Sequence, residues 1–106
     1  MADSLTASNG VATITGTTVY TVPAGAVATL IGMSSANTDT EASHWVGWTV
    51  GGRYVSGPQV PIAVGSTFDP IVGRKIVATE GQEVVVFSDT DVHVDVVLSF
   101  LEQTGA

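Results

Sequence analysis

The sequence predicts an all-β fold: a single antiparallel β-sandwich, jelly-roll-like, with seven to nine short strands and no significant helix. Val, Ile and Thr together number 37, whereas Leu and Met together number six. Branching at Cβ restricts a side chain in a helix and favours the pleated strand. Turn-forming residues recur roughly every ten residues, a spacing typical of sandwiches made of short strands.

Length and composition indicate one folded domain. A chain of 106 residues is long enough for a single core and too short for two. Hydrophobic residues make up 44% and charged residues only 12%, about half the usual charged share. This balance excludes a disordered acidic segment of the low-hydrophobicity, high-charge kind.

Three strands are expected in the first third of the chain, each bounded by a turn signal. The first follows Asn9-Gly10, the second ends at Pro23-Ala24-Gly25, and the third begins after that turn. These strands are residues 11–15, 18–22 and 26–35. Residues 1–10 are polar and are expected to form a flexible N-terminal arm outside the sandwich domain of residues 11–102.

Residues 44–50 and 53–56 are expected to form a hairpin around Gly51-Gly52. Two glycines satisfy the positive φ angles of a primed turn, whose twist matches that of the flanking strands. The expected register pairs Val50 with Arg53, Thr49 with Tyr54, Trp48 with Val55 and Val46 with Gly57. Trp48 then shares a face with Val46 and Val55 and is expected in the core, while Trp45, Thr49 and Tyr54 share the opposite face.

Four more strands are expected at residues 59–63, 75–78, 83–88 and 92–101, before a short tail at 103–106. The last strand is the clearest because apolar and polar residues alternate along it. Its expected core face carries Val92, Val94, Val96, Leu98 and Phe100. Its other face carries Asp91, His93, Asp95, Val97 and Ser99.

The row of Asp91, His93 and Asp95 is the strongest candidate for a cation site. On a strand these side chains share one face, roughly 6.5 to 7 Å apart. A hard cation would need further ligands from neighbouring strands, and the Ca²⁺ loop pattern fails because Val94 and Phe100 replace its glycine and glutamate. The row is therefore expected to be a solvated strand face, with no metal and no cofactor bound.

Catalytic patterns point away from an enzyme. The sequence has no G-x-S-x-G motif, no cysteine, and only two histidines, His44 and His93, neither near a strand-to-helix turn. Glycine-rich phosphate loops are missing as well, since Gly51-Gly52 precedes an expected strand and not a helix. We expect a binding or structural protein.

The net charge of the chain excludes two classes of binding partner from what we expect. The net charge is −7, with Arg53, Arg74 and Lys75 as the only cations, so neither a nucleic acid nor an anionic membrane surface is an expected partner. The first ten residues show neither a basic region nor an apolar stretch, so no secretory signal is visible.

Apolar side chains placed off the core face are the candidates for partner binding. They are Trp45 and Tyr54 on the hairpin, Val97 and Leu101 on the last strand, and Leu5 in the arm. The Trp45 and Tyr54 pair either packs under a loop or meets another molecule, and aromatic platforms of this kind also stack on sugar rings.

Several segments resemble small β-sandwich structural proteins of tailed bacteriophage virions. The segments are YTVPAG (residues 20–25), the aromatic hairpin, VPIAVGST (60–67), IVATEGQEVVV (76–86) and VDVVLSFLE (94–102). The likeness covers about residues 17–102. Within that group the size is typical of capsid decoration, or cement, proteins.

The resemblance implies a function carried by surfaces and no catalytic residues. It implies a protein made in the host cytoplasm that binds the major capsid protein on the outside of the phage head and stabilises the shell as a homotrimer. Two alternatives stay open: a receptor- or glycan-binding module of the tail or fibre, and a protein of the head-to-tail joint.

Overall fold

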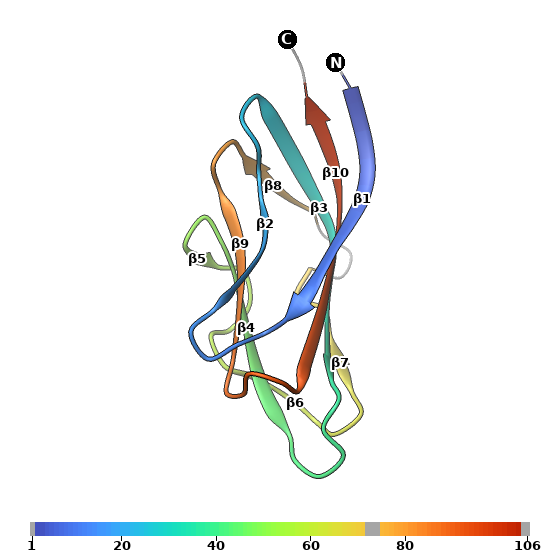
Figure 1. Cartoon of the computed structure of the whole chain (residues 1–106), viewed down its shortest axis with the longest axis vertical. Coiled ribbons are helices and arrows are strands. Elements are labelled where there is room, and N and C mark those ends of the chain that lie inside the picture. Colours follow the sequence, from blue (N-terminus) through green and yellow to red (C-terminus); the bar gives the residue numbers. More distant parts are fainter. Residues whose placement is uncertain (1, 72–74, 105–106) are drawn as a thin grey trace.

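The computed structural model describes residues 2–71 and 75–104, which form ten strands and contain no helix. The all-β prediction is confirmed. In chain order the strands are β1 (Ala2–Val11), β2 (Thr17–Thr21), β3 (Ala26–Asn37), β4 (His44–Val50), β5 (Arg53–Tyr54), β6 (Val60–Ile62), β7 (Thr67–Phe68), β8 (Ile76–Thr79), β9 (Glu83–Ser88) and β10 (Val94–Thr104) (Figure 1). A search of the described residues for an apolar helix of membrane-spanning length found none.

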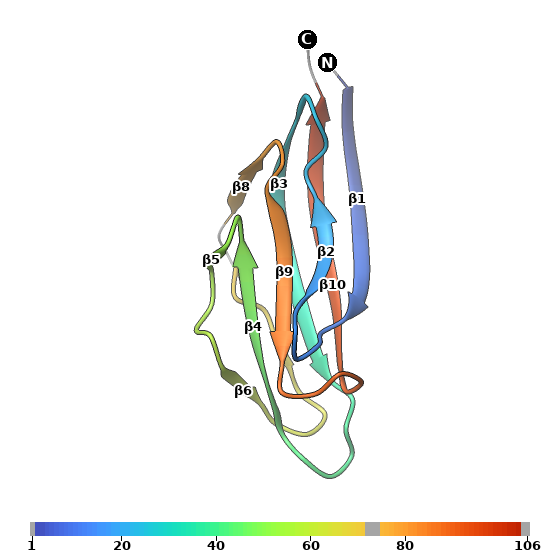
Figure 2. The ribbon, with the colours of Figure 1, turned by 60° about the vertical axis from the view of Figure 1, so that its left-hand side comes forward.

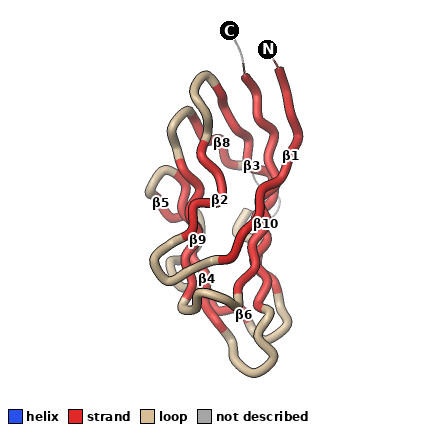
Figure 3. Tube along the Cα trace, in the orientation of Figure 1, coloured by secondary structure: helices blue, strands red, loops and turns tan. Residues whose placement is uncertain are grey.

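Two antiparallel sheets pack face to face (Figures 1 and 3). Sheet A has the order β1-β10-β3, with β7 and β8 both paired to β3; sheet B has the order β2-β9-β4, with β5 and β6 both paired to β4. The chain crosses repeatedly between the sheets, and its first strand lies beside its last, which is the arrangement of a jelly-roll-like sandwich. The molecule is elongated, measuring 50 × 24 × 19 Å (Figure 2).

The core lies between the two sheets and is mostly aliphatic, with two buried aromatic residues, Trp48 and Phe100. Trp48 on β4 is completely buried, as predicted, and its indole Nε1 donates a hydrogen bond of 2.7 Å to Ser35 Oγ on β3. This bond joins sheet B to sheet A in the interior. Towards one end of the sandwich, Tyr20 of β2 packs on Phe100 of β10, with ring centroids 4.0 Å apart.

The N-terminal segment differs from its prediction. Residues 1–10 were expected to form an arm outside the sandwich, but residues 2–11 form β1, which pairs with β10 from Ala2 opposite Thr104 to Val11 opposite Asp95. The segment looks like a loop in sequence because an edge strand that is exposed on both faces needs no apolar alternation. The strand expected at residues 11–15 does not form, because the chain leaves sheet A after Val11. Thr13 makes an isolated bridge to Phe87.

The last strand is shifted towards the C-terminus. It begins at Val94 and continues to Thr104, so most of the expected core face is confirmed, but Val92 lies before the strand and is 66% exposed. Residues 103 and 104, expected in a tail, pair with both β1 and β3. Residues 105 and 106 lie outside the described residues.

The hairpin turn is confirmed, and its register is confirmed next to the turn. Gly51 and Gly52 have φ angles of 59° and 80°, and Thr49 pairs with Tyr54 as expected. Further along, the expected pairing of Val46 with Gly57 is wrong, because Val46 pairs with Val60 of β6. The ladder is interrupted where Trp48 N donates to Ser56 Oγ instead of to a backbone carbonyl.

Two strands in the middle of the chain are shorter than expected: β5 has two residues and β6 has three. β8 has the expected four residues, shifted by one position, and the two-residue β7 falls in a stretch where no strand was predicted. With β7 added, the described residues form ten strands where seven to nine were expected.

Candidate functional site

The outer face of sheet A carries a row of aligned side chains that crosses four strands. Leu5 of β1 lies opposite Leu101 of β10, Leu101 lies opposite Thr29 of β3, and Thr29 lies opposite Val77 of β8. Strand pairing places neighbouring members of such a row roughly 5 Å apart, within contact distance of one another. Two residues that were predicted separately, Leu5 and Leu101, are therefore direct neighbours.

Further aliphatic side chains extend this row along the strands. The outer-face residues include Val97 of β10 and Val27 and Ile31 of β3, and Leu5 and Val77 are the most exposed, at 73% and 59%. Side chains at alternate positions of a strand point to opposite faces, so these residues lie opposite the core. We call the set Leu5, Val27, Ile31, Val77, Val97 and Leu101 the outer apolar face.

A shallow hollow lies within this face. It is lined by Leu5, Thr6, Ala7, Ile31 and Ser99, from β1, β3 and β10. The β3–β10 ladder has a bulge here, between Ser99 and Phe100, which leaves Ile31 without a direct partner. Bulges re-aim side chains locally, and this one places Ile31 at the hollow.

β1 is also an edge strand, because β10 is the one strand among the described residues that pairs with it. Its end near Val11 is tied to β2 by side chains: Ser8 Oγ donates to the carbonyl of Val19, and Thr17 Oγ1 donates to the carbonyl of Val11. No corresponding bond to β2 is found among the described residues before Ser8. A strand edge of this kind offers backbone N–H and C=O groups for pairing with another chain.

Trp45 and Tyr54 share the outer face of sheet B, as predicted, but they do not form a pair. Trp45 lies opposite Pro61 and Tyr54 lies opposite Thr49. Because Trp45 and Thr49 are four residues apart on β4, the backbone positions of the two aromatic residues are separated by roughly 13 Å along the strand. Tyr54 is 54% exposed and Trp45 is half-buried, so Tyr54 is the more accessible of the two.

Tyr54 borders a groove on the outer face of sheet B. The groove runs from the Gly51-Gly52 turn to Phe87 and has a mixed polar and apolar lining, made by Thr49, Gly51, Gly52, Tyr54, Gly81, Gln82, Glu83, Val85 and Phe87. An exposed aromatic ring and hydrogen-bonding side chains thus line one hollow.

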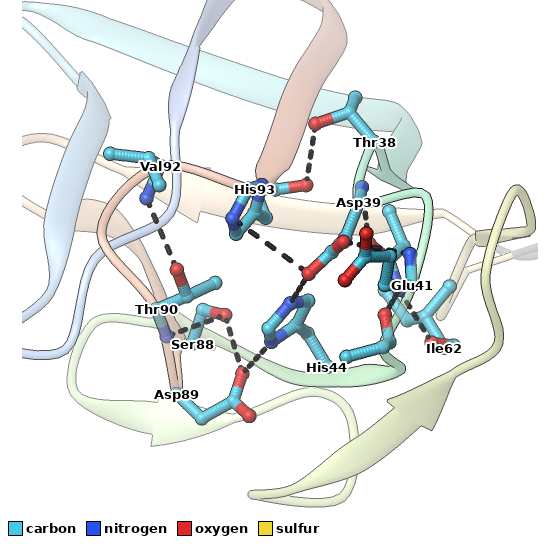
Figure 4. Close-up of polar contacts among 12 residues, drawn as sticks. Thr38, Asp39, Glu41, His44, Ile62, Ser88, Asp89, Thr90, Val92 and His93 are labelled. Atoms are coloured by element: carbon cyan, nitrogen blue, oxygen red, sulfur yellow. Dashed lines mark hydrogen bonds and ion pairs between the residues drawn. The ribbon is translucent and has the colours of Figure 1, made fainter.

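A polar cluster lies where the β3–β4 and β9–β10 connections meet, at the end of the sandwich opposite the pairing of Ala2 with Thr104 (Figure 1). Figure 4 shows the polar contacts of the cluster. His44 is at its centre: its Nε2 is 2.8 Å from Asp39 Oδ2, and its Nδ1 is 3.1 Å from Asp89 Oδ1. The ring of His93 lies against that of His44, with centroids 5.2 Å apart, and its Nε2 is 3.7 Å from the same Asp39 oxygen.

Two connections between the sheets build this cluster. Asp39 lies in the β3–β4 connection and His44 begins β4, while Asp89 and His93 lie in the β9–β10 connection. Thr38 ties the two connections together, since both its backbone N and its Oγ1 donate to the carbonyl of His93.

The first of these connections is held by a buried side chain. Asn37 Nδ2 donates to the carbonyls of Ala42 and Ile62, and Asn37 Oδ1 accepts from the backbone N of Asp39. Asp39 Oδ1 in turn accepts from the backbone N of Glu41. The Asp39 carboxylate is therefore fixed in position by the backbone around it.

The predicted row of Asp91, His93 and Asp95 does not form. Asp91 and His93 precede β10, and the Asp91 carboxylate accepts a hydrogen bond from the backbone N of Ile14. Asp95 is on β10, opposite Val11. The row was predicted wrongly because the expected strand began at residue 92, two residues before Val94, the first paired residue of β10. The side chain of His93 instead lies beside those of Asp39 and His44.

The hydrogen bonds of the cluster shift the pKa values of its members. The hydrogen bond from His44, helped by the backbone N of Glu41, lowers the pKa of Asp39 from 3.8 to about 2. The Asp39 carboxylate raises the pKa of His44 above 6.5, against the opposing effect of burial, and Asp89 adds to the increase.

These shifts predict a pH window for the stabilising effect of the His44–Asp39 pair. The contribution of His44 is complete below pH 6.5 and is lost as the pH rises through its increased pKa; that of Asp39 is complete above pH 3.8 and is lost as the pH falls towards about 2. The stabilisation is therefore greatest between these limits. We expect His44→Gln to lower the free energy of unfolding more at about pH 5 than at about pH 8.5. Urea unfolding with a metal chelator present measures this, and an equal loss at both pH values would contradict it.

No protein-family model matches this chain, and searches of curated proteins and of solved structures found no match either. The functional inference therefore rests on the two surfaces and the cluster described above.

Proposed function

We propose that this chain is a structural protein of a tailed-phage virion, a decoration or cement protein that binds the outside of the head and stabilises it as a homotrimer. The observation that carries the proposal is the outer apolar face of sheet A. Scattered single hydrophobic residues are normal on a protein surface, whereas several aliphatic side chains gathered on one face of a sheet are typical of an interaction site.

Three copies of the chain cover this face when they surround one axis. Each outer apolar face then points inwards, and Leu5, Leu101 and their neighbours form a second, intermolecular core. The outer side chains of β3 and β10 between them include Thr29, Ser34 and Ser99, which are small and uncharged and so add little desolvation cost. The one charged residue on this face of β10, Asp95, lies at the Val11 end of the β1–β10 ladder, away from Leu5 and Leu101. The opposite outer face, that of sheet B, remains exposed in this arrangement.

The edge of β1 supports attachment to the major capsid protein. An extended segment of a shell subunit can add to an unpaired strand edge by backbone hydrogen bonds, with little dependence on side chains. Each trimer presents three such edges. Several weak contacts made together hold the trimer on the shell far more tightly than one contact holds a single copy.

Heads assembled from the major capsid protein without this chain test the proposal. Added chain should bind them saturably in multiples of three, and the decorated heads should break at a higher temperature. We expect Leu5→Lys to lower occupancy by tenfold or more at fixed concentration, because losing one buried leucine costs about 1.5–3 kcal/mol per interface. Occupancy is measured by sedimenting the heads and quantifying the bound chain.

Val92→Lys is the matched control for this experiment. Val92 is 66% exposed, close to the 73% of Leu5, but it lies in the β9–β10 connection and not on sheet A. Undiminished binding by Leu5→Lys, or an equal loss with Val92→Lys, would overturn the assignment of this face.

A second candidate function is that of a glycan-binding module on a tail or fibre. The groove beside Tyr54 favours it, since an aromatic ring with neighbouring Gln82 and Glu83 can stack on a sugar and bond its hydroxyls. The same particle experiment separates the two candidates. A loss of binding with Tyr54→Ala, but not with Leu5→Lys, would move the contact to sheet B.

A further inference from the structure

The polar cluster brings three metal-ligating side chains together from two connections. One ligand atom from each of Asp39, His44 and His93 lies within 4.8 Å of the others. Asp39 Oδ2 is 2.8 Å from His44 Nε2 and 3.7 Å from His93 Nε2. In a tetrahedral zinc site with bonds of about 2.0–2.1 Å, ligand atoms lie roughly 3.3 Å apart. Both distances differ from that value by about half an ångström.

The fourth side chain of the cluster, Asp89, favours the tautomer of His44 that can bind a metal ion. A carboxylate at neutral pH only accepts hydrogen bonds, so the 3.1 Å contact places a proton on His44 Nδ1. In the neutral ring, Nε2 then carries the lone pair, and Nε2 is the atom that faces Asp39. Metal-bound histidines almost always have such an outer carboxylate or carbonyl partner on the second ring nitrogen.

A divalent ion can take the place of one proton in this arrangement. The contact between His44 Nε2 and Asp39 Oδ2 needs a hydrogen between the two atoms, in addition to the one on Nδ1. An ion that displaces this hydrogen binds the nitrogen lone pair and the carboxylate oxygen directly.

The three ligand side chains also differ in solvent exposure, and the most exposed one gives an ion access to the site. The side chains of His44 and Asp39 are only 13% and 16% exposed, whereas that of His93 is 41% exposed. Asp39 is fixed by the Asn37 and Glu41 backbone contacts described above. His93 can therefore turn to close the site, and its open side leaves room for a water molecule as a fourth ligand.

We propose that Asp39, His44 and His93 bind one first-row divalent transition-metal ion, zinc in the first instance, with Asp89 as the outer partner of His44. Two imidazole nitrogens and one carboxylate oxygen suit zinc, whereas magnesium and calcium prefer shells made of oxygen alone. The bound ion joins the β3–β4 and β9–β10 connections. It thereby links sheet A to sheet B at the end of the sandwich.

Titration of the full chain, without an affinity tag and after treatment with a chelator, tests the site. With ZnCl₂ as the probe, isothermal titration calorimetry should give one ion per chain. The melting temperature should rise by on the order of 10 °C when zinc is about 100-fold above its dissociation constant. Equal concentrations of MgCl₂ and CaCl₂ should leave the melting temperature unchanged.

Three variants assign the ligands. His93→Gln and Asp39→Asn should each weaken zinc binding on the order of 100-fold or more, because even the loss of an outer partner costs about 10–100-fold. Asp91→Asn is the matched control: it lies in the same connection as His93, accepts its bond from Ile14 N with an oxygen that Asn retains, and should bind zinc as the wild type does.

His93→Gln keeps the proposal testable if Asp39→Asn disturbs the fold, because the His44 bonds to Asp39 and Asp89 do not involve His93. The absence of a zinc-dependent rise in melting temperature would overturn the proposal. Zinc binding by His93→Gln with wild-type affinity would overturn it equally.

Discussion

Replacing Trp48 by alanine is expected to lower the melting temperature by roughly 15 °C or more. Removing a buried tryptophan side chain costs about 3–5 kcal/mol, and a domain of this size shifts by roughly 4–8 °C for each kcal/mol. Trp48 is completely buried at the centre of β4. Since whole domains are stable by only about 5–15 kcal/mol, the variant should lose a large part of its free energy of unfolding.

The loss has two physical parts. A cavity replaces the indole between the sheets, and Ser35 Oγ is left in the interior without the donor that now lies 2.7 Å away. A buried polar atom that loses its partner costs about 1–3 kcal/mol. Thermal unfolding followed by circular dichroism measures the sum.

Trp45→Ala is the internal comparison because it removes the same side chain from the same strand. Trp45 is half-buried on the outer face of sheet B, so its loss should lower the melting temperature much less. If the two variants melted at the same temperature, the position of Trp48 as the centre of the core would be wrong.

Leu5→Lys and Val97→Lys are each expected to convert the proposed trimer into monomers. Each removes an aliphatic side chain from all three subunits, so the trimer dissociation constant should rise on the order of 10³-fold or more. The two positions lie on different strands, and Leu5 and Val97 are 73% and 44% exposed, so neither change should unfold the subunit. Sedimentation velocity gives the mass, and circular dichroism checks the fold.

The positive charge of the new lysine cannot account for the expected loss of the trimer. The wild-type net charge of −7 makes subunits repel one another, and a new lysine reduces that repulsion. Electrostatics alone would therefore favour association in the variants. Trimers that persist in Leu5→Lys and Val97→Lys, with Val92→Lys as the matched loop control, would place the subunit contact elsewhere.

Local sequence patterns were sufficient to predict the parts of the fold that are determined by residues close together in the chain. The alternation from Val94 to Phe100 identified the core face of β10, since the strand period of two leaves one choice of face. Gly51-Gly52 identified the hairpin because few other pairs adopt positive φ at both positions. Two layers of short strands followed from these signals and from composition.

β1 could not be predicted by the same reasoning. Its side chains Ser4, Leu5, Thr6 and Ala7 are exposed on both faces, so nothing in their order marks a strand. The segment is ordered by backbone pairing with β10, whose residues lie about ninety positions later in the chain. Leu5 was predicted to be a contact residue, but its alignment with Leu101 depended on this pairing.

The polar cluster was missed for a related reason. Asp39 and His44 are close in sequence, but Asp89 and His93 meet them only because two connections cross between the sheets at the same end. The two histidines were the one sequence feature that could have indicated the cluster. The acids on either side of His93, Asp91 and Asp95, were wrongly predicted to be its neighbours. Contacts of this kind follow from topology and not from spacing.

The mass of the untagged wild-type chain in solution tests the central claim most directly, because that claim is that the outer face of sheet A is covered by other copies of the chain. Sedimentation equilibrium at micromolar to millimolar concentrations should show a concentration-dependent species of three times 10.8 kDa. A single-chain mass across that whole range would contradict the account.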